Sequence, residues 1–116
     1  MTERIAERDI CWAPLVLGES EKVRTCIVIG VIADIATVVY GQGRPGDCGS
    51  ILVKLDSDLG KRARLTKDTH FREGNVTMVK LSQIQKKVGV CPRGKFLDFQ
   101  DLAERFFKKT NPQTGQ

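Results

Sequence analysis

The chain has 116 residues, which is enough for one domain with one hydrophobic core and too few for two domains of ordinary size. Its 41% hydrophobic and 28% charged residues are typical of a soluble globular protein and exclude a disordered or membrane-embedded class. The formal charge of +5 is uneven, because residues 1–58 hold six Lys or Arg against nine Asp or Glu, whereas residues 59–116 hold thirteen against five. We predict a single domain over residues 1–110 and a flexible tail over residues 111–116.

No segment predicts a membrane span or a metal site. The longest apolar stretch, residues 25–33, is far shorter than the roughly 20 residues that a spanning helix needs. The first four residues carry mixed charge and no apolar signal core, so we expect a cytoplasmic protein. The cysteines form no close pair of the kind that binds zinc, and we predict reduced, mostly buried thiols with no metal and no cofactor. They are Cys11, Cys26, Cys48 and Cys91.

The first half of the chain predicts paired strands. Residues 10–15 mix apolar and aromatic side chains with Pro14, which indicates an edge or outer strand, and residues 17–22 are polar and predict a loop. Residues 23–31 are rich in Val and Ile with little alternation, as in a strand covered on both faces. A tight reversal at 32–35 leads to an antiparallel partner at 36–40, and the glycines and proline of 41–47 predict a loop.

The second half continues with short elements and ends in a helix. We predict strands at 50–55, 75–81 and 86–91, a short strand or irregular basic crossing at 62–66, and one helical turn at 82–84. Residues 92–94 stop the last strand. Apolar residues at i, i+3, i+4 and i+7 then predict a helix packed on the sheet, with Asp98 as its N-terminal cap. They are Phe99, Leu102, Ala103 and Phe106.

Several short motifs occur in the order known from one protein family. Asp9-Ile10-Cys11-Trp12 is followed by Arg24-Thr25 with the apolar residues 26–29, by Val38-Val39-Tyr40-Gly41, and by Thr69-His70-Phe71-Arg72 with residues 75–81. Over residues 9 to about 107 this order resembles the MazF/PemK family. Arg8 stands where the family usually has glycine, and Thr25 where it usually has proline.

The resemblance implies a fold and an activity. The implied fold is mainly β: a small, strongly bent antiparallel barrel of the SH3-like, MazF/PemK type with a C-terminal α-helix. The implied protein is a homodimeric type II toxin, a metal-independent endoribonuclease on single-stranded RNA that a cognate antitoxin inhibits. Arg24 matches the family arginine, whose planar guanidinium suits phosphate oxygens. The alternative for Arg24 is a structural ion pair with Glu19 or Glu21.

The second catalytic element of the family, a Thr or Ser after the next strand, is replaced here by Gly41-Gln42-Gly43. Gln42 cannot act as an acid or base, although its amide could bind a phosphate or a base edge. Tyr40, Thr37 or His70 could supply the lost group, and we name Tyr40 and His70 with Arg24 as the candidate catalytic residues. An incidental role for the single histidine remains the alternative.

A basic stretch predicts the RNA-binding surface. Residues 61–72 contain five cations and a single acid, Asp68, which favours a polyanionic partner. Solvated strand-edge charges that prevent edge pairing are the alternative. The predicted RNA-binding residues are Gln42, Arg44, Lys61, Arg62, Arg64, Lys67 and Arg72.

Three hypotheses follow for function. The first is a MazF/PemK-like toxin whose nuclease activity is weak or lost. The second is an inactive binding module of the same fold that grips RNA or another protein, for example as a phage-encoded inhibitor. The third is an unrelated barrel that binds nucleic acid through residues 61–72. We also predict a homodimer, because a barrel this small leaves apolar side chains such as Val28 and Val38 difficult to cover.

Overall fold

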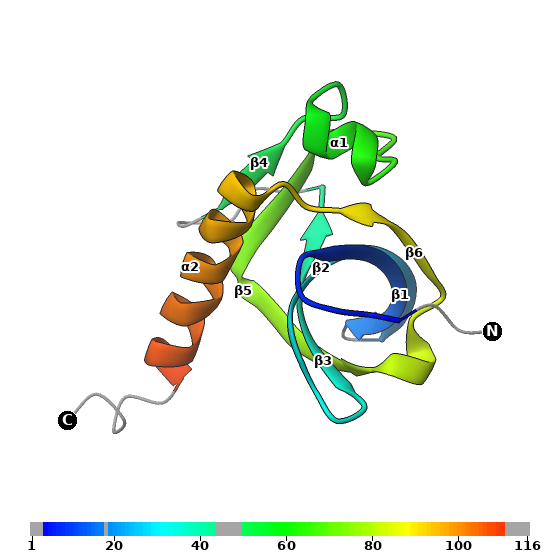
Figure 1. Cartoon of the computed structure of the whole chain (residues 1–116), viewed down its shortest axis with the longest axis vertical. Coiled ribbons are helices and arrows are strands. Elements are labelled where there is room, and N and C mark those ends of the chain that lie inside the picture. Colours follow the sequence, from blue (N-terminus) through cyan, green and yellow to red (C-terminus); the bar gives the residue numbers. More distant parts are fainter. Residues whose placement is uncertain (1–3, 18, 44–49, 111–116) are drawn as a thin grey trace.

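The computed structural model describes residues 4–17, 19–43 and 50–110. A six-stranded antiparallel sheet, in the order β4-β5-β3-β2-β1-β6, curls into a half-barrel, and a long C-terminal helix lies beside it (Figure 1). The elements are β1 (Asp9–Leu17), β2 (Ser20–Ile32), β3 (Ile35–Gln42), β4 (Ile51–Val53), α1 (Asp58–Arg62), β5 (Thr69–Lys80), the 3-10 turn η1 (Leu81–Gln83), β6 (Lys86–Val90) and α2 (Arg93–Thr110). The predicted bent antiparallel sheet with a C-terminal helix is therefore confirmed. No helix in the described ranges is long and apolar enough to cross a membrane.

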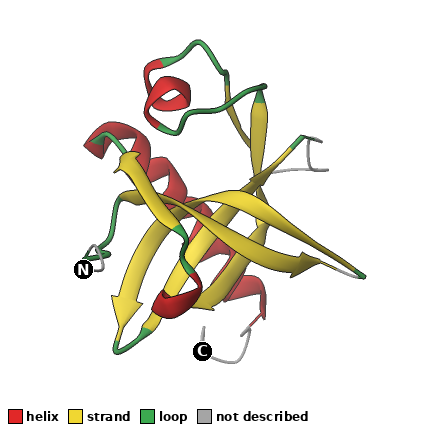
Figure 2. Ribbon diagram, turned by 90° about the vertical axis from the view of Figure 1, so that its right-hand side faces the viewer, coloured by secondary structure: helices red, strands yellow, loops and turns green. Residues whose placement is uncertain are grey.

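Apolar side chains gather on both faces of the curled sheet. The first cluster lies between the sheet and the helices, where the rings of Phe71 and Phe99 meet edge to face at 5.1 Å between centroids. The second cluster fills the opposite face and includes Cys26, Val28 and Val38. The side view of Figure 2 shows the long helix against one face of the sheet. Residues 26–28 of β2 are buried from both sides, as their unbroken apolar run predicted.

The turn between β2 and β3 matches its prediction, but the loop before β2 does not. Ile32 pairs with Ile35, and Ala33 adopts a positive φ of 56° in the tight reversal between them. Residues 17–22, predicted as a loop, instead complete the β1–β2 hairpin as far as the pair Leu17 and Ser20. Main-chain pairing to β1 holds this end of β2 in a strand although its side chains at residues 20–23 are exposed.

Pro14 lies in a strand that has two neighbours, not at the edge of the sheet. β1 pairs with β2 from Ile10 to Leu17, and with β6 only from Asp9 to Trp12. Pro14 lies beyond Trp12, the last residue of β1 that pairs with β6. The backbone N–H that proline lacks is therefore not needed for pairing on that side. The prediction of an edge or outer strand is therefore correct for the part of β1 that follows Trp12, and wrong for residues 10–12, which have a neighbouring strand on each side.

The crossing from β4 to β5 differs most from its prediction. β4 is limited to three residues, and β5 begins at Thr69, six residues before the predicted start. Between them lies the short helix α1, which ends at Arg62, where we predicted a strand or an irregular crossing. Ser57 Oγ accepts a hydrogen bond from Gly60 N at 3.0 Å, and Leu59 is buried. A Cβ on Gly60 would lie 2.1 Å from the carbonyl oxygen of Lys54, so only glycine fits.

Helix α2 carries the predicted apolar stripe but begins earlier than predicted. Its first residue is Arg93, and Phe96 N donates to the carbonyl of Pro92 at 2.9 Å, so Asp98 lies inside the helix and does not cap it. The extra turn adds Phe96 to the buried stripe.

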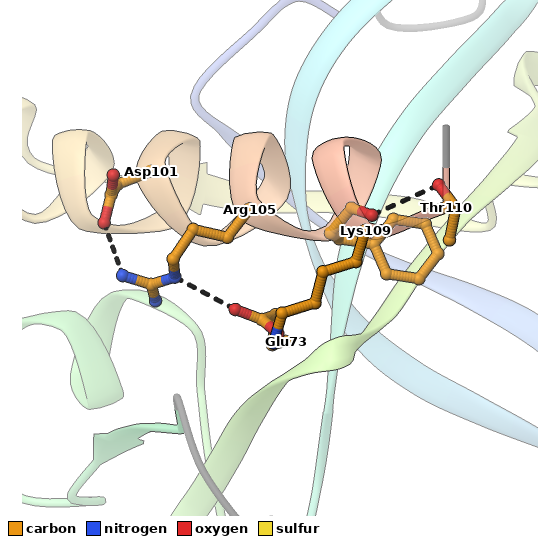
Figure 3. Close-up of polar contacts among 6 residues, drawn as sticks. Glu73, Asp101, Arg105, Lys109 and Thr110 are labelled. Atoms are coloured by element: carbon orange, nitrogen blue, oxygen red, sulfur yellow. Dashed lines mark hydrogen bonds and ion pairs between the residues drawn. The ribbon is translucent and has the colours of Figure 1, made fainter. Parts of the chain in front are cut away.

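Ion pairs hold the second half of α2 against β5. Arg105 donates to Glu73 at 3.0 Å and to Asp101 at 2.6 Å, and Lys109 binds the same Glu73 (Figure 3). The hydrogen bond from Lys109, with that from Arg105, lowers the pKa of Glu73 below its ordinary value of 4.5, against the opposing effect of burial. The carboxylate of β5 is therefore charged at neutral pH and neutralised by the helix.

The side chains that suggested a dimer are covered within one chain. Val28 and Val38 are both fully buried in the second cluster. The argument for a homodimer from these two residues is therefore wrong, and oligomeric state stays a prediction.

Candidate nucleic-acid interface

A cavity opens where two pairs of strands separate. The ladder between β2 and β3 ends at the pair Cys26 and Tyr40. Beyond it, β2 stays paired with β1 as far as Ser20, while β3 stays paired with β5 as far as Gln42 and His70. The gap between the diverging strands forms a cavity of about 370 Å³, within the range of ligand-binding pockets.

Four segments far apart in sequence line this cavity. The loop between α1 and β5 closes one side, and the ends of β2 and β3 form the others. The lining consists of Trp12, residues 23–25, residues 41–43, residues 64–67 and Thr69. Each of the three segments predicted for RNA binding or catalysis thus contributes a lining residue: Arg24, Gln42, and Arg64 with Lys67.

Three cations border the cavity, and its described lining contains no acid. The cations are Arg24, Arg64 and Lys67. Arg24 Nε is buried and has no hydrogen-bond partner. The predicted structural alternative, an ion pair of Arg24 with Glu19 or Glu21, does not form. A buried donor left unpaired is costly, so Arg24 Nε has an unmet hydrogen bond beside the cavity.

Two of the three candidate catalytic side chains lie outside the cavity lining. Tyr40 is half-buried and packs against the second apolar cluster. His70 is half-buried on β5, with its Nδ1 3.3 Å from Ser50 Oγ. Neither residue lines the cavity that Arg24 borders. The arrangement therefore separates the positive charge from the two groups proposed for proton transfer.

Several of the predicted RNA-binding residues also lie outside the cavity lining. Lys61 and Arg62 are exposed in α1, and Arg62 is paired with Asp58 at 3.0 Å. Arg72 is half-buried in β5 and is not a lining residue. Arg44 lies outside the described residues, as does Cys48.

Gln42 borders the cavity and is held by a residue that we did not predict. Asn75 Nδ2 donates to Gln42 Oε1 and to the carbonyl oxygen of Tyr40, both at 3.2 Å. Asn75 is only 5% exposed, and it lies in the irregular part of β5 opposite the end of β3. The signal in the sequence was a glycine, Gly74, directly before the strand predicted over residues 75–81, because a glycine within an extended segment indicates a bulge.

Close packing surrounds the glycine that follows Tyr40. A Cβ on Gly41 would lie 2.3 Å from Thr69 Cγ2 and 3.0 Å from the Phe71 ring, so any side chain there would require the Thr69 side chain to shift. Thr69 is itself buried, and its hydroxyl donates to the carbonyl of Lys67 at 3.0 Å. A hydroxyl-bearing residue at position 41 would therefore disturb the packing of Thr69 and Phe71.

Two of the described thiols have a raised pKa. Burial raises the pKa of Cys91 to about 11. A hydrogen bond with Cys11, together with burial, raises the pKa of Cys26 well above its ordinary value. Both thiols therefore stay protonated at neutral pH. Within the described part of the chain, no group of three or more His, Cys, Asp or Glu residues could hold a metal ion.

A scan against protein-family models finds no match for the chain, and a search of curated proteins finds no significant relative. The resemblance to MazF/PemK proteins therefore rests on the quoted motifs and their order.

Proposed function

We propose that the protein binds single-stranded RNA at the cavity of Arg24, Arg64 and Lys67, as a MazF/PemK-like protein whose endoribonuclease activity is weak or lost. One observation carries the proposal: three cations border a cavity that has no acid among its described lining residues, and Arg24 Nε is buried there without a partner. Elsewhere, Arg62 and Arg105 are paired with acids. Phosphate oxygens would supply the acceptors that Arg24 lacks.

The size of the cavity favours an unpaired strand over a duplex. A space of about 370 Å³ between diverging strands can admit a nucleotide of a single strand, whereas a base-paired helix would have to remain outside. Threonines and Gln42 line the same cavity as the cations, and their hydroxyl and amide groups could bind sugar or base edges.

The expected weakness of cleavage follows from where the proton-transfer candidates lie. Attack by a ribose 2′-oxygen needs a positioned base and a positioned acid, each typically worth 10²–10⁴-fold in rate. Tyr40 and His70 do not line the cavity, and the hydroxyls that do are poor bases at neutral pH. RNA binding needs only the cations, so we expect it to be retained although rapid cleavage is lost.

The second candidate function is a module that uses the same fold to bind a protein. The absence of Tyr40 and His70 from the described cavity lining favours it over a fast nuclease. Both proposals include a protein partner, either a cognate antitoxin or another protein. Both also include a homodimer. An unrelated barrel that binds nucleic acid through residues 61–72 is less well supported, because only Arg64 and Lys67 of the five cations in that stretch line the cavity.

The test measures binding and cleavage in parallel, with EDTA present. Labelled single-stranded RNA is incubated with the wild type, Arg24→Ala and His70→Ala, and with Arg93→Ala as a control that removes an exposed charge away from the cavity. We expect wild-type binding that falls about tenfold or more in Arg24→Ala and is unchanged in the other two variants, with little or no cleavage throughout.

Two outcomes would contradict this proposal. Rapid EDTA-resistant cleavage that His70→Ala abolishes would restore the toxin hypothesis with His70 in the active site. Absence of RNA binding by the wild type would favour the protein-binding module.

A further inference from the structure

The only tryptophan of the chain lies beside the cationic cavity. Trp12 pairs with Thr25 of β2 and with Lys86 of β6, and both Trp12 and Thr25 are lining residues. Its indole is half-buried and belongs to neither of the two apolar clusters found in the described chain. This large aromatic ring lies outside the core and lines the same cavity as three unpaired cations, so a bound ligand could cover the part of the ring that the protein leaves exposed.

We propose that Trp12 stacks on a nucleobase while Arg24, Arg64 and Lys67 hold the neighbouring phosphate. The preferred ligand is then a polyanion that carries bases, not a bare chain of phosphates. This inference rests on the proposed RNA-binding function and names the chemical group that the site recognises besides phosphate. Stacking on aromatic side chains is the usual way in which unpaired bases are held, and it tolerates any base because each one has a π-face.

The surroundings of the indole suit this arrangement. Leu65 and Val23 add apolar surface to the same cavity, and Val23 is 51% exposed. Lys86 Nζ lies 6.0 Å from the centre of the Trp12 ring, at the outer limit of a cation–π contact. Lys86 is exposed and therefore available to a second phosphate of the same strand, one step beyond the stacked base.

The uniqueness of Trp12 makes the proposal directly measurable. Tryptophan fluorescence of the wild type reports on this one ring. We expect quenching by an oligouridylate of about eight residues, and little change with an abasic oligonucleotide of the same length or with inorganic polyphosphate. Fluorescence anisotropy of the same ligands, carrying a dye, measures binding independently of Trp12.

Two substitutions separate stacking from packing. Trp12→Leu removes the aromatic surface and should weaken oligouridylate binding roughly tenfold, whereas its affinity for polyphosphate stays unchanged. Trp12→Phe keeps a ring and should retain most of the affinity. Phe107→Leu, which changes an aromatic residue of α2 that is 36% exposed and does not line the cavity, serves as the matched control. Thermal melts verify that each variant is folded.

The outcomes distinguish this inference from the proposal beneath it. Oligouridylate binding with unchanged fluorescence, or with equal affinity in Trp12→Leu, would overturn base stacking and leave RNA binding intact. If the wild type binds no oligonucleotide at all, both proposals fail. If Trp12→Leu does not fold, the comparison of base-bearing and abasic ligands on the wild type, together with Trp12→Phe, decides.

Discussion

Two groups of cations in this protein differ in whether acids neutralise them. At the end of α2, Arg105 and Lys109 converge on Glu73 of β5, and Arg105 also binds Asp101. At the cavity, Arg24, Arg64 and Lys67 have no such partner in the described chain, and Arg24 Nε is buried unpaired.

The comparison teaches that the number of basic residues is a poor guide to a binding surface. Sequence alone gave residues 61–72 the densest positive charge, yet Arg62 is paired with Asp58. The cavity differs in that its described lining contains no acid. A cation that is already paired with a carboxylate binds a phosphate less strongly, whereas the cations of the cavity are not neutralised in this way. The helix cluster should therefore govern stability, and the cavity cluster should govern binding.

The largest expected effect on stability belongs to the helix side. Phe99 is fully buried and stacks edge to face on Phe71, so Phe99→Ala should lower the free energy of unfolding by about 3–5 kcal/mol. Phe106 is only half-buried, and Phe106→Ala should have a smaller effect. Urea titrations measure both. RNA affinity, measured well below each midpoint, should remain at the wild-type level, and a parallel loss of affinity would break the division between the two regions.

Next in size is a packing defect at the cavity. Gly41→Ala places a methyl group against Thr69 Cγ2 and should destabilise the fold by about 1–3 kcal/mol. Thr69→Ser removes that methyl and should restore part of the loss in the double variant. The Phe71 ring, 3.0 Å away, prevents full recovery. If thermal denaturation shows no loss in Gly41→Ala, the close approach of β3 and β5 at this point is wrong.

The smallest effect concerns Glu73, whose cationic partners, Arg105 and Lys109, are exposed to solvent. The folded state lowers the pKa of this carboxyl below 4.5, so its contribution is fully present above about pH 4.5 and is lost as the pH falls through the lowered value. Glu73→Gln should therefore reduce the melting temperature at pH 7, and the difference from the wild type should shrink below pH 4.5. A pH-independent difference would mean that Glu73 acts through packing and not through charge.

Much of the fold could be predicted, because local pattern and tertiary packing agree. Val28 and Val38 belong to apolar runs that read as buried strands, and Phe99 and Leu102 belong to a helical stripe. Helix α1 could not be recognised, because five residues with an internal Gly60 carry too weak a periodic signal. It depends on the Ser57 cap and on the backbone of residue 54, which crowds Gly60.

The candidate site was only half predictable for a related reason. Arg24 and the basic stretch were identified by residue type, but the cavity exists because the β2–β3 ladder stops at Cys26 and Tyr40. Strand registers and bulges of this kind depend on the whole sheet. No local sequence pattern could therefore predict that Trp12 lines the cavity and that His70 does not.

The central claim is that unpaired cations, and not total charge, carry RNA binding. The direct test is the slope of log affinity against log salt concentration for single-stranded RNA, in two variants that each lose three charges. Arg24→Ala/Arg64→Ala/Lys67→Ala removes the cations of the cavity, and Arg62→Ala/Arg105→Ala/Lys109→Ala removes three helix cations that are paired with acids. We predict a slope reduced by about two units in the cavity variant, from roughly 0.7 for each phosphate contact on a single strand, and a nearly unchanged slope in the helix variant. Equal reductions in both, or a reduction confined to the helix variant, would contradict the account.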